Sequence, residues 1–320
     1  MITKRLDLVF KRPAGTSRGT MTTRPSLVFA EEKTLGWAVG EAAPLAGLSL
    51  ETIEEVAPGT SSHQTAMEML ARDDGRHVLW PSDFTDGKTS VRINGLVWMG
   101  DRAFVEEQIR SLLDRGFRCI KMKVGAADFA EELAVIRAIH SADADVEIRV
   151  DANGTFAPLE ALEKLDALHE AGVFSIEQPI KPGQGTRMAA LCAASPLRIA
   201  LDEELIPVRE REAREALLDE VHPSMVVLKP SLMGGFASCD EWIELAEARG
   251  IGWWVTSALE SNIGLNAIAQ WVAAKHPRST QGLGTGSLFV DNFACPLRLE
   301  GEVMSFDPEA AWDLSRLDLP

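Results

Sequence analysis

Beyond residue 90 the chain alternates between short apolar runs and longer stretches in which apolar residues recur at helical spacing. Short runs of this kind are typical of buried strands, and the stretches between them are typical of amphipathic helices. The runs are VRINGLVW, CIKMKV, EIRVDA, FSIEQPI, RIALDEE, MVVLKPS, GWWVTSA and TQGLGTG. One marker residue can be taken late in each run: Asn94, Lys123, Asp151, Glu177, Asp202, Lys229, Ser257 and Gly282. Neighbouring markers lie 25 to 29 residues apart, the length of one strand–helix unit, so the pattern predicts an α/β fold with a TIM-like (β/α)7β barrel over residues 90–298.

The first ninety or so residues have a different pattern. Three runs predict an antiparallel meander: LDLVFKR, RPSLVFAEE and LGWAVGEAA. A glycine-bounded segment, PAGTSRGTM, is expected to be a mobile loop between the first two strands. Helices interrupted near Pro58 are expected between Ser49 and Arg72. We therefore expect a separate α+β domain over residues 1–89.

Composition narrows the possible partners. Among 320 residues, 48 are acidic and 32 are Lys or Arg, which gives a net charge of −16. Such an acidic chain is a poor candidate for binding nucleic acid or an anionic membrane, and it suits a divalent cation. The 4 cysteines lie far apart without a CxxC pair, which indicates reduced thiols in a cytoplasmic protein. The N-terminus lacks the apolar run of a signal peptide, and we expect no membrane-spanning segment.

Three acidic residues fall late in three consecutive predicted strands. Asp151, Glu177 and Asp202 should therefore be neighbours at the C-terminal mouth of the barrel, where barrel active sites lie. Three converging carboxylates repel one another unless a cation lies between them. A hard divalent ion prefers oxygen ligands of this kind, so the sequence predicts a Mg²⁺ site in which Mn²⁺ can substitute.

Lysines occur on the flanking strands. Lys121 and Lys123 are two residues apart and face the same side of the second strand, whereas Lys229 belongs to the sixth strand, across the barrel. A lysine near other cations has its pKa lowered, and Lys121 could have this effect on Lys123, which would then be a usable base. These parts suit removal of a proton α to a metal-bound carboxylate. The alternative is that the lysines only neutralise the acids.

The run IRVDANG carries polar residues at alternate positions. Arg149, Asp151 and Asn153 should share the inner face of a strand, with Asp151 at the metal and Asn153 at the pocket edge. Arg149 lies one step deeper, where it either pairs with a ligand carboxylate or forms a structural ion pair.

The GLGTG segment around Gly282 lacks the spacing of a dinucleotide loop. Its backbone N–H groups, with Ser257, could instead bind a substrate anion.

Several motifs together resemble the muconate-lactonising branch of the enolase superfamily. They are KMK at 121–123, RVDAN at 149–153, IEQP at 176–179, LDEE at 201–204 and LKP at 228–230. Three further segments are similar to the o-succinylbenzoate synthases of that branch: AGTSRG at 14–19, SALESNIGLNAIAQW at 257–271 and QGLGTGSLFVDNF at 281–293. The similarity runs through the whole chain. It implies that residues 1–89 form a capping domain, completed by residues 299–320, with a loop over the barrel mouth.

The resemblance also implies a reaction, the dehydration of 2-succinyl-6-hydroxy-2,4-cyclohexadiene-1-carboxylate to o-succinylbenzoate in menaquinone biosynthesis. Lys123 would remove the α-proton and then assist departure of the hydroxyl, and Lys229 would stabilise the anion as a fixed cation. Ser257 and Gly282 would hold the succinyl carboxylate. Lys121, Asn153 and Arg18 would also bind substrate, the last from the AGTSRG loop. Arg149 and Glu203 are expected behind the ligands, with both roles of Arg149 still open.

Two other functions stay open. An N-acylamino acid racemase or dipeptide epimerase would use the same residues, with Lys123 and Lys229 as opposed bases. A non-catalytic barrel that only binds metabolites belongs to another class, and the complete set of acids and lysines argues against it. The expected partner is a small-molecule carboxylate, and the oligomeric state is open.

Overall fold

The computed structural model describes residues 1–16 and 19–320, and its largest sheet is parallel. In this described part the sheet has 7 strands in the order β11-β10-β9-β8-β7-β6-β5. Their bounds are β5 (Gly95–Val97), β6 (Cys119–Lys123), β7 (Glu147–Asp151), β8 (Val173–Glu177), β9 (Arg198–Leu201), β10 (Met225–Leu228) and β11 (Gly252–Val255). Parallel bridges from Ile93 to Gln281 and from Thr256 to Gly282 close the sheet. The predicted barrel is confirmed, with its last strand reduced to these two bridging residues.

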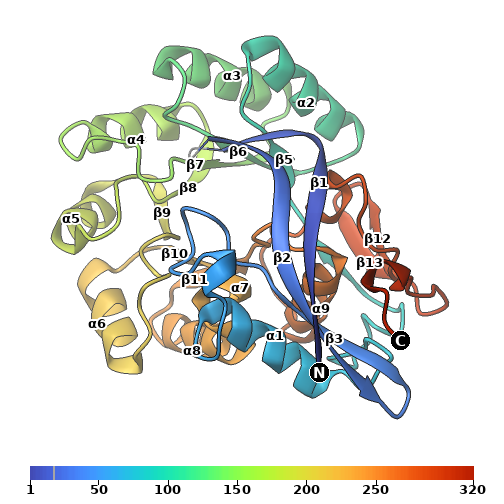
Figure 1. Cartoon of the computed structure of the whole chain (residues 1–320). Coiled ribbons are helices and arrows are strands. Elements are labelled where there is room, and N and C mark those ends of the chain that lie inside the picture. The colour runs from blue at the N-terminus through green and yellow to red at the C-terminus, as the bar shows by residue number, and fades with distance from the viewer. Residues whose placement is uncertain (17–18) are drawn as a thin grey trace.

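Helices follow the strands along the chain, and those labelled α2 to α6 and α8 form the outer arc that Figure 1 shows. The helices are α2 (Arg102–Asp114), α3 (Phe129–Ala142), α4 (Ala161–Glu170), α5 (Gly185–Ala194), α6 (Arg211–Val221), α7 (Pro230–Met233), α8 (Gly235–Glu247) and α9 (Asn262–Ala274). Strand residues Ile120, Ile148 and Ile176 are fully buried in the core shared by the strands and helices. Because side chains alternate along a strand, the residues between them, such as Lys121 and Arg149, point to the other face, into the barrel.

The N-terminal region is an antiparallel sheet of β1 (Ile2–Thr16), β2 (Gly19–Lys33) and β3 (Gly36–Ala42). The predicted meander is confirmed, but the expected loop PAGTSRGTM is mostly strand, since Ala14 pairs with Met21 beyond a register shift. Backbone pairing extends both strands where side-chain alternation is weak. The helical turn η1 (Ile53–Glu55) and α1 (Ser61–Arg72) follow, and they are separated around Pro58 as expected. Figure 1 shows β1 and β2 crossing in front of the barrel strands.

A second antiparallel sheet contains β4 (Ser90–Arg92), β12 (Leu297–Glu300) and β13 (Val303–Phe306). The run VRINGLVW, expected to be one barrel strand, is therefore divided between β4 and β5. The reason is a distant partner, because β4 pairs with β13 and the Ile93 N–H donates to the Glu302 carbonyl. Near the C-terminus, Leu317 packs with Leu6 and Val28 of the N-terminal sheet. The proposed division at residue 89 stays a prediction.

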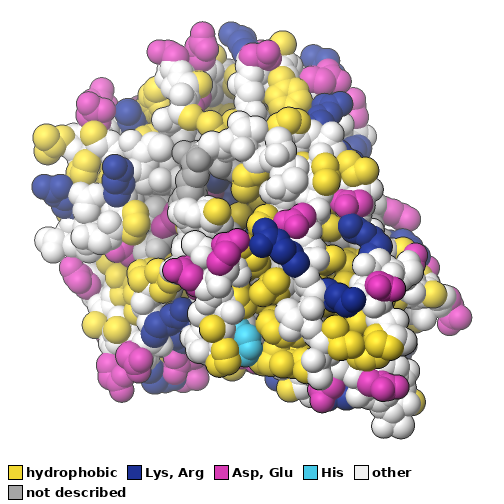
Figure 2. Space-filling model, in the orientation of Figure 1, with side chains coloured by type: hydrophobic (Ala, Val, Ile, Leu, Met, Phe, Trp, Pro, Cys, Tyr) yellow, Lys and Arg dark blue, Asp and Glu magenta, His cyan; other side chains and the backbone are white. Residues whose placement is uncertain are grey.

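The surface carries both signs of charge. On the face drawn in Figure 2, acidic side chains lie mostly around the periphery with basic ones interspersed, and apolar side chains occupy much of the centre. Within the described residues, no helix combines the length and the apolar character needed to cross a bilayer.

Candidate functional site

Three acidic side chains meet where three neighbouring strands end. Asp151 is the last residue of β7, Glu177 is the last residue of β8, and Asp202 follows β9 directly. Asp151 and Glu177 are register partners, which places their side chains next to each other. One carboxylate oxygen from each of the three residues lies within 4.8 Å of the other two. All three side chains are buried, so the carboxylates gain little from water.

The donor set fits a divalent cation. All three groups are carboxylates, which hard cations prefer. The Glu177 Oε1 atom is buried and has no hydrogen-bond partner among the described residues. Burial raises the pKa of Glu177 to about 7, and the neighbouring charges of Asp151 and Asp202 act in the same direction. A cation between these groups would satisfy the orphaned oxygen and favour the ionised carboxylate, so the residues fit the predicted metal.

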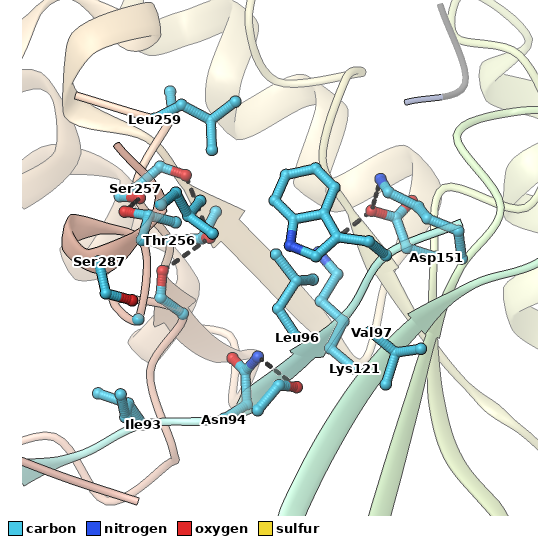
Figure 3. A pocket seen from close by; sticks show the side chains of 18 of the residues that line it. Ile93, Asn94, Leu96, Val97, Lys121, Asp151, Thr256, Ser257, Leu259 and Ser287 are labelled. Carbon is cyan, nitrogen blue, oxygen red and sulfur yellow. Dashed lines mark hydrogen bonds and ion pairs between the residues drawn. The ribbon is translucent and has the colours of Figure 1, made fainter. Parts of the chain in front are cut away.

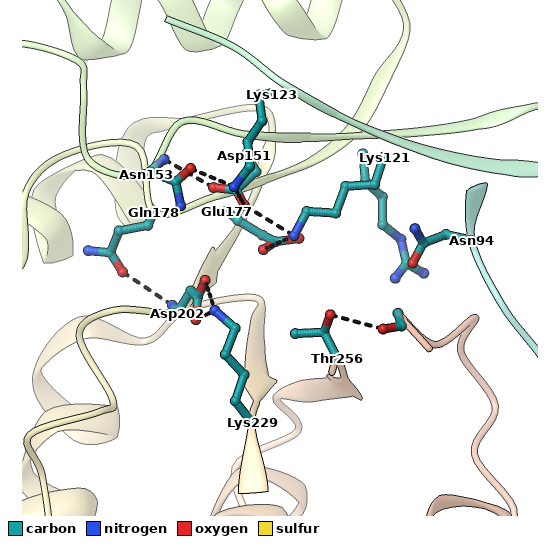
Figure 4. A network of polar contacts seen from close by, with 12 residues as sticks. Asn94, Lys121, Lys123, Asp151, Asn153, Glu177, Gln178, Asp202, Lys229 and Thr256 are labelled. Carbon is teal, nitrogen blue, oxygen red and sulfur yellow. Dashed lines mark hydrogen bonds and ion pairs between the residues drawn. The ribbon is translucent and has the colours of Figure 1, made fainter. Parts of the chain in front are cut away.

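Three lysines contact these carboxylates in the structure (Figure 4). The Lys121 Nζ atom lies 2.5 Å from Glu177 Oε2 and 3.1 Å from Asp151 Oδ2. The Lys123 Nζ atom lies 2.7 Å from Asp151 Oδ2, and Lys229 pairs with the carboxylate of Asp202. Each buried negative charge thus has a positive partner.

The charges of the cluster favour the ionised form of Asp151 and the charged forms of Lys229 and Lys121. Burial opposes ionisation of Asp151, but Lys123 and Lys121 outweigh it and hold the pKa of Asp151 well below its usual range. Burial by itself would also lower the pKa of Lys229, yet the charge of Asp202 raises it overall. The pKa of Lys121 is likewise raised, because the nearby carboxylates outweigh burial. In this arrangement Lys121 is held as a cation by the acids.

The two predicted catalytic lysines approach the acids from opposite sides, as Figure 4 shows. Lys123 ends β6, whereas Lys229 follows β10 and precedes Pro230, the first residue of α7. Proline at the first helical position suits an abrupt change from strand to helix, so Lys229 is held at the barrel mouth. The strands β7, β8 and β9 lie between the two lysines in the sheet. A group bound over the carboxylates would therefore have an ammonium group on each side.

A cavity of about 260 Å³ opens beside the carboxylates. It is lined by predicted site residues from both halves of the barrel: Lys121, Lys123, Asp151, Asn153, Lys229, Ser257 and Gly282. Figure 3 shows Ser257 and Asp151 on opposite sides of the cavity. Gly15 and Met21 of the β1–β2 hairpin also line it. Arg18, predicted to bind substrate from the same hairpin, lies outside the described residues.

Asn153 and Glu203 connect Lys123 to the segment that follows β9. The Asn153 side chain accepts a hydrogen bond of 2.5 Å from Lys123 and donates one of 2.8 Å to Glu203. Asn153 has φ of 44°, a left-handed conformation that asparagine tolerates better than most residues. The amide therefore holds the Lys123 ammonium group and the Glu203 carboxylate in a fixed relation.

Arg149 lies deeper in the barrel. Its guanidinium group pairs with Glu147 at 2.6 Å, donates to the Thr280 carbonyl at 2.9 Å and lies over the Trp254 ring at 4.6 Å. Of the two roles considered for Arg149, this geometry matches the structural ion pair. Within the described residues, none of its hydrogen bonds or ion pairs reaches a carboxylate of the acidic cluster.

Gln178 is a residue of the site that the sequence reasoning missed. It is fully buried, and its φ of 40° is left-handed. Its amide oxygen accepts hydrogen bonds from the N–H groups of Asp202 and Glu204, both at 3.2 Å. Its amide nitrogen donates to the carboxylate of Glu204, also at 3.2 Å. Gln178 follows the predicted ligand Glu177 directly, so it links the segment after Glu177 to the segment that carries Asp202. In the sequence, only its place in the IEQP motif could have indicated this role.

Replacing Gln178 by leucine is expected to weaken metal binding about 10- to 100-fold, because the backbone that carries Asp202 loses its acceptor. Titration of metal-free protein with Mn²⁺, followed by electron paramagnetic resonance, measures the affinity without any substrate. Gln184→Leu is the matched control, since Gln184 precedes α5 and its side chain bonds, among the described residues, to Lys181 and Arg187 and not to the acidic cluster. Equal Mn²⁺ affinities for the two variants would remove Gln178 from the support of the site.

The chain is similar in sequence to proteins of known family. The enolase C-terminal domain-like family matches residues 104–302. An o-succinylbenzoate synthase of Desulfotalea psychrophila is 41% identical, over 94% of this chain and 97% of the relative. The chain belongs to the o-succinylbenzoate synthase family of the enolase superfamily. A second member of that family, from Haemophilus influenzae, is 28% identical over 78% of each chain.

Solved structures agree with this family. The crystal structure of MenC from Desulfotalea psychrophila superposes with a TM-score of 0.85 at 37% identity, covering 95% of this chain and 98% of that one. The L-Ala-D/L-Glu epimerase of Bacillus subtilis has a TM-score of 0.83 at 20% identity, covering 95% of both chains. The latter likeness shows the shared fold alone. The predicted resemblance and fold are thereby confirmed, and the family supports a divalent metal at the acidic cluster.

Proposed function

We propose that this chain is a Mg²⁺-dependent o-succinylbenzoate synthase that dehydrates 2-succinyl-6-hydroxy-2,4-cyclohexadiene-1-carboxylate, a step of menaquinone biosynthesis. The observation that carries the proposal is the buried cluster of Asp151, Glu177 and Asp202 between two opposed lysines, in a chain of this family. The three carboxylates would hold Mg²⁺, for which Mn²⁺ can substitute. When bound, the ion supplies positive charge against the negative charge that develops on the substrate carboxylate.

Lys123 is the proposed base. Its Nζ atom takes the proton α to the ring carboxylate and then delivers a proton to the departing hydroxyl, so one group serves both halves of the elimination. Its hydrogen bond to Asn153 supports this role, because Asn153 is itself held by Glu203. A base must be held within hydrogen-bond reach of the proton that it removes, and this chain of contacts restricts the ammonium group to one side of the pocket.

Lys229 is proposed to act as a fixed cation. It lies across the pocket from Lys123, so its charge reaches the opposite face of the anion that forms on proton removal. Lys121, which touches two of the carboxylates, would add positive charge behind them. Loss of water makes the ring aromatic, and the overall elimination is therefore strongly downhill.

The far side of the cavity is proposed to take the succinyl arm. Ser257 lines that side, away from the lysine–carboxylate cluster. Gly282 also lines the cavity and lies beside Ser257, since its carbonyl accepts a hydrogen bond of 3.0 Å from the Ser257 N–H. The Ser257 hydroxyl is 2.5 Å from the Thr285 hydroxyl, so the two form a small polar pair that can turn toward a carboxylate. Arg18, which lies outside the described residues, is proposed to help screen the negative charge of the substrate. We also propose a cytoplasmic location, because the cysteines are free thiols.

A racemase of N-succinylamino acids is the second candidate, since the opposed lysines would give a base on each face of a substrate. Wild-type protein with Mg²⁺ should be supplied with the cyclohexadiene substrate and, separately, with N-succinylamino acids. We expect rapid loss of the diene absorbance and negligible racemisation. Efficient racemisation without dehydration would contradict the proposed function and favour the second candidate. Lys123→Ala protein is the control for uncatalysed dehydration.

A further inference from the structure

One buried cation has no part in the proposed chemistry. Arg24 lies on β2, and its side chain is only 2% exposed. Its guanidinium group donates to the carbonyls of Ala43 at 2.7 Å and Pro44 at 2.6 Å, just after β3. It also donates at 3.1 Å to the carbonyl of Ala258, in the segment that follows barrel strand β11. A single side chain thus joins the N-terminal sheet region to the barrel.

The segments that Arg24 joins are two walls of the substrate cavity. The first wall contains Leu45, Ala46 and Leu48, directly after the Ala43 and Pro44 carbonyls. The second wall contains residues 257–259. Arg24 is outside the set of described residues that line the cavity. It therefore affects a bound molecule only through the walls that it holds.

The second wall has a conformation that needs support. Leu259 has φ of 65°, which is left-handed and unfavourable for a branched apolar residue. The preceding residue is held at both backbone groups, since the Ala258 carbonyl accepts from Arg24 and its N–H donates to Glu260 at 2.7 Å. Glu260 is fully buried and accepts a second hydrogen bond from Ser231. Two buried side chains of opposite charge thus hold the strained turn in place.

A second contact from the N-terminal sheet reaches the same segment. Glu41 on β3 accepts hydrogen bonds from the Ser261 N–H at 3.0 Å, the Ser261 hydroxyl at 2.6 Å and the Gly264 N–H at 2.9 Å. These groups lie at the N-terminus of α9, where a carboxylate is favourable. Burial lowers the pKa of Arg24, whereas the charges of Glu260 and Glu41 act to raise it. Both carboxylates therefore favour the charged form of Arg24, although burial and the charge of Glu41 raise the pKa of Glu260.

We infer that Arg24 is a specificity-determining positioning residue, which sets the spacing between wall 43–48 and wall 257–259 so that the cavity fits the succinyl arm. This inference rests on the proposed function for the identity of that arm. Arg24 acts on substrate binding and not on proton transfer, because Lys123, Lys229 and the three carboxylates belong to the barrel, whereas Arg24 belongs to β2 of the N-terminal sheet. Lysine cannot replace it, since one ammonium group cannot present the planar fork that reaches carbonyls on both walls.

Kinetics of Arg24→Lys test the inference, with Arg5→Lys on the exposed face of β1 as the matched control. We expect KM for the cyclohexadiene substrate to rise about tenfold or more, because at least one buried carbonyl loses its donor. At saturating substrate, kcat and the exchange of the α-proton with deuterium should stay within about twofold, and Mn²⁺ affinity should be unchanged. A KM equal to that of Arg5→Lys, or a fall in kcat at unchanged KM, would overturn the inference.

Hydrogen exchange of the wild-type protein supplies a test that needs no variant and no substrate. If Arg24 joins the walls, amides in 43–48 and 257–259 should open together, with one opening equilibrium after correction for intrinsic rates. Opening of the two walls with clearly different equilibria would refute the inference. Absence of dehydration by the wild-type protein would instead refute the proposed function, and the exchange experiment would still decide whether Arg24 joins the walls.

Discussion

Alanine at position 123 is expected to lower kcat about 10²- to 10⁴-fold, the usual contribution of a positioned general base. The physical reason is that Lys123 alone is proposed to take the α-proton, from the side of the pocket where Asn153 holds its ammonium group. Dehydration is followed by the loss of diene absorbance. Exchange of the substrate α-proton with solvent deuterium, measured by nuclear magnetic resonance, should stop in the same variant. Lys181→Ala, at an exposed position after β8, is the matched control.

Lys229→Ala separates the synthase from a racemase. In a synthase Lys229 is a fixed charge, so its loss should slow the reaction while leaving exchange through Lys123 chemically possible. In a racemase each lysine would serve one enantiomer, and Lys229→Ala would abolish exchange for one enantiomer only. Continued α-proton exchange in Lys123→Ala at the wild-type rate would show that another group is the base.

Removal of divalent metal with EDTA is expected to abolish activity, and added Mg²⁺ or Mn²⁺ should restore it. The ion is expected to lie between Asp151, Glu177 and Asp202, whose carboxylate oxygens lie within 4.8 Å of one another, and EDTA would take it away. A substrate carboxylate would then meet a cluster of buried carboxylates with no cation to bind it. Initial rates before chelation, after chelation and after metal addition provide the measurement.

A calcium-loaded sample is an informative control for this experiment. Ca²⁺ also takes oxygen ligands but prefers longer distances and more ligands than Mg²⁺, so it should occupy the acids without full recovery of the rate. Undiminished turnover by protein shown to be metal-free would exclude the assignment of Asp151, Glu177 and Asp202 as ligands of an essential ion.

The residues that carry the chemistry could be predicted from the sequence because a regular spacing of strands along the chain indicates a barrel, in which all strands end at one mouth. Strands that recur at a nearly constant step bring their C-terminal ends to one mouth, so late polar residues such as Asp151, Glu177 and Lys229 are expected to converge. Alternation along a strand likewise places Lys121 and Lys123 on the same inner face. Neither inference needs knowledge of distant contacts, which explains why the acidic cluster and the flanking lysines were predictable.

Other features depend on partners that are remote in the sequence. The run VRINGLVW is continuous in pattern, yet β4 leaves the barrel because β13, more than two hundred residues later, supplies its backbone partners. The PAGTSRGTM segment contains turn-forming residues, but pairing with the opposite strand extends β1 and β2 into it. Alternation and turn propensity are local properties, whereas strand partners are chosen by tertiary packing.

The same distinction holds at the site. The sequence by itself determined which strand ends carry acids, lysines and amides, since the spacing of strand–helix units and side-chain alternation specify them. Only the tertiary structure decided what each polar side chain contacts: Gln178 reaches the backbone of Asp202, and Arg24 reaches Ala258 across the boundary between sheet and barrel. A buried polar group takes whichever partner the fold brings within about 3 Å, and that choice is not encoded in any local pattern.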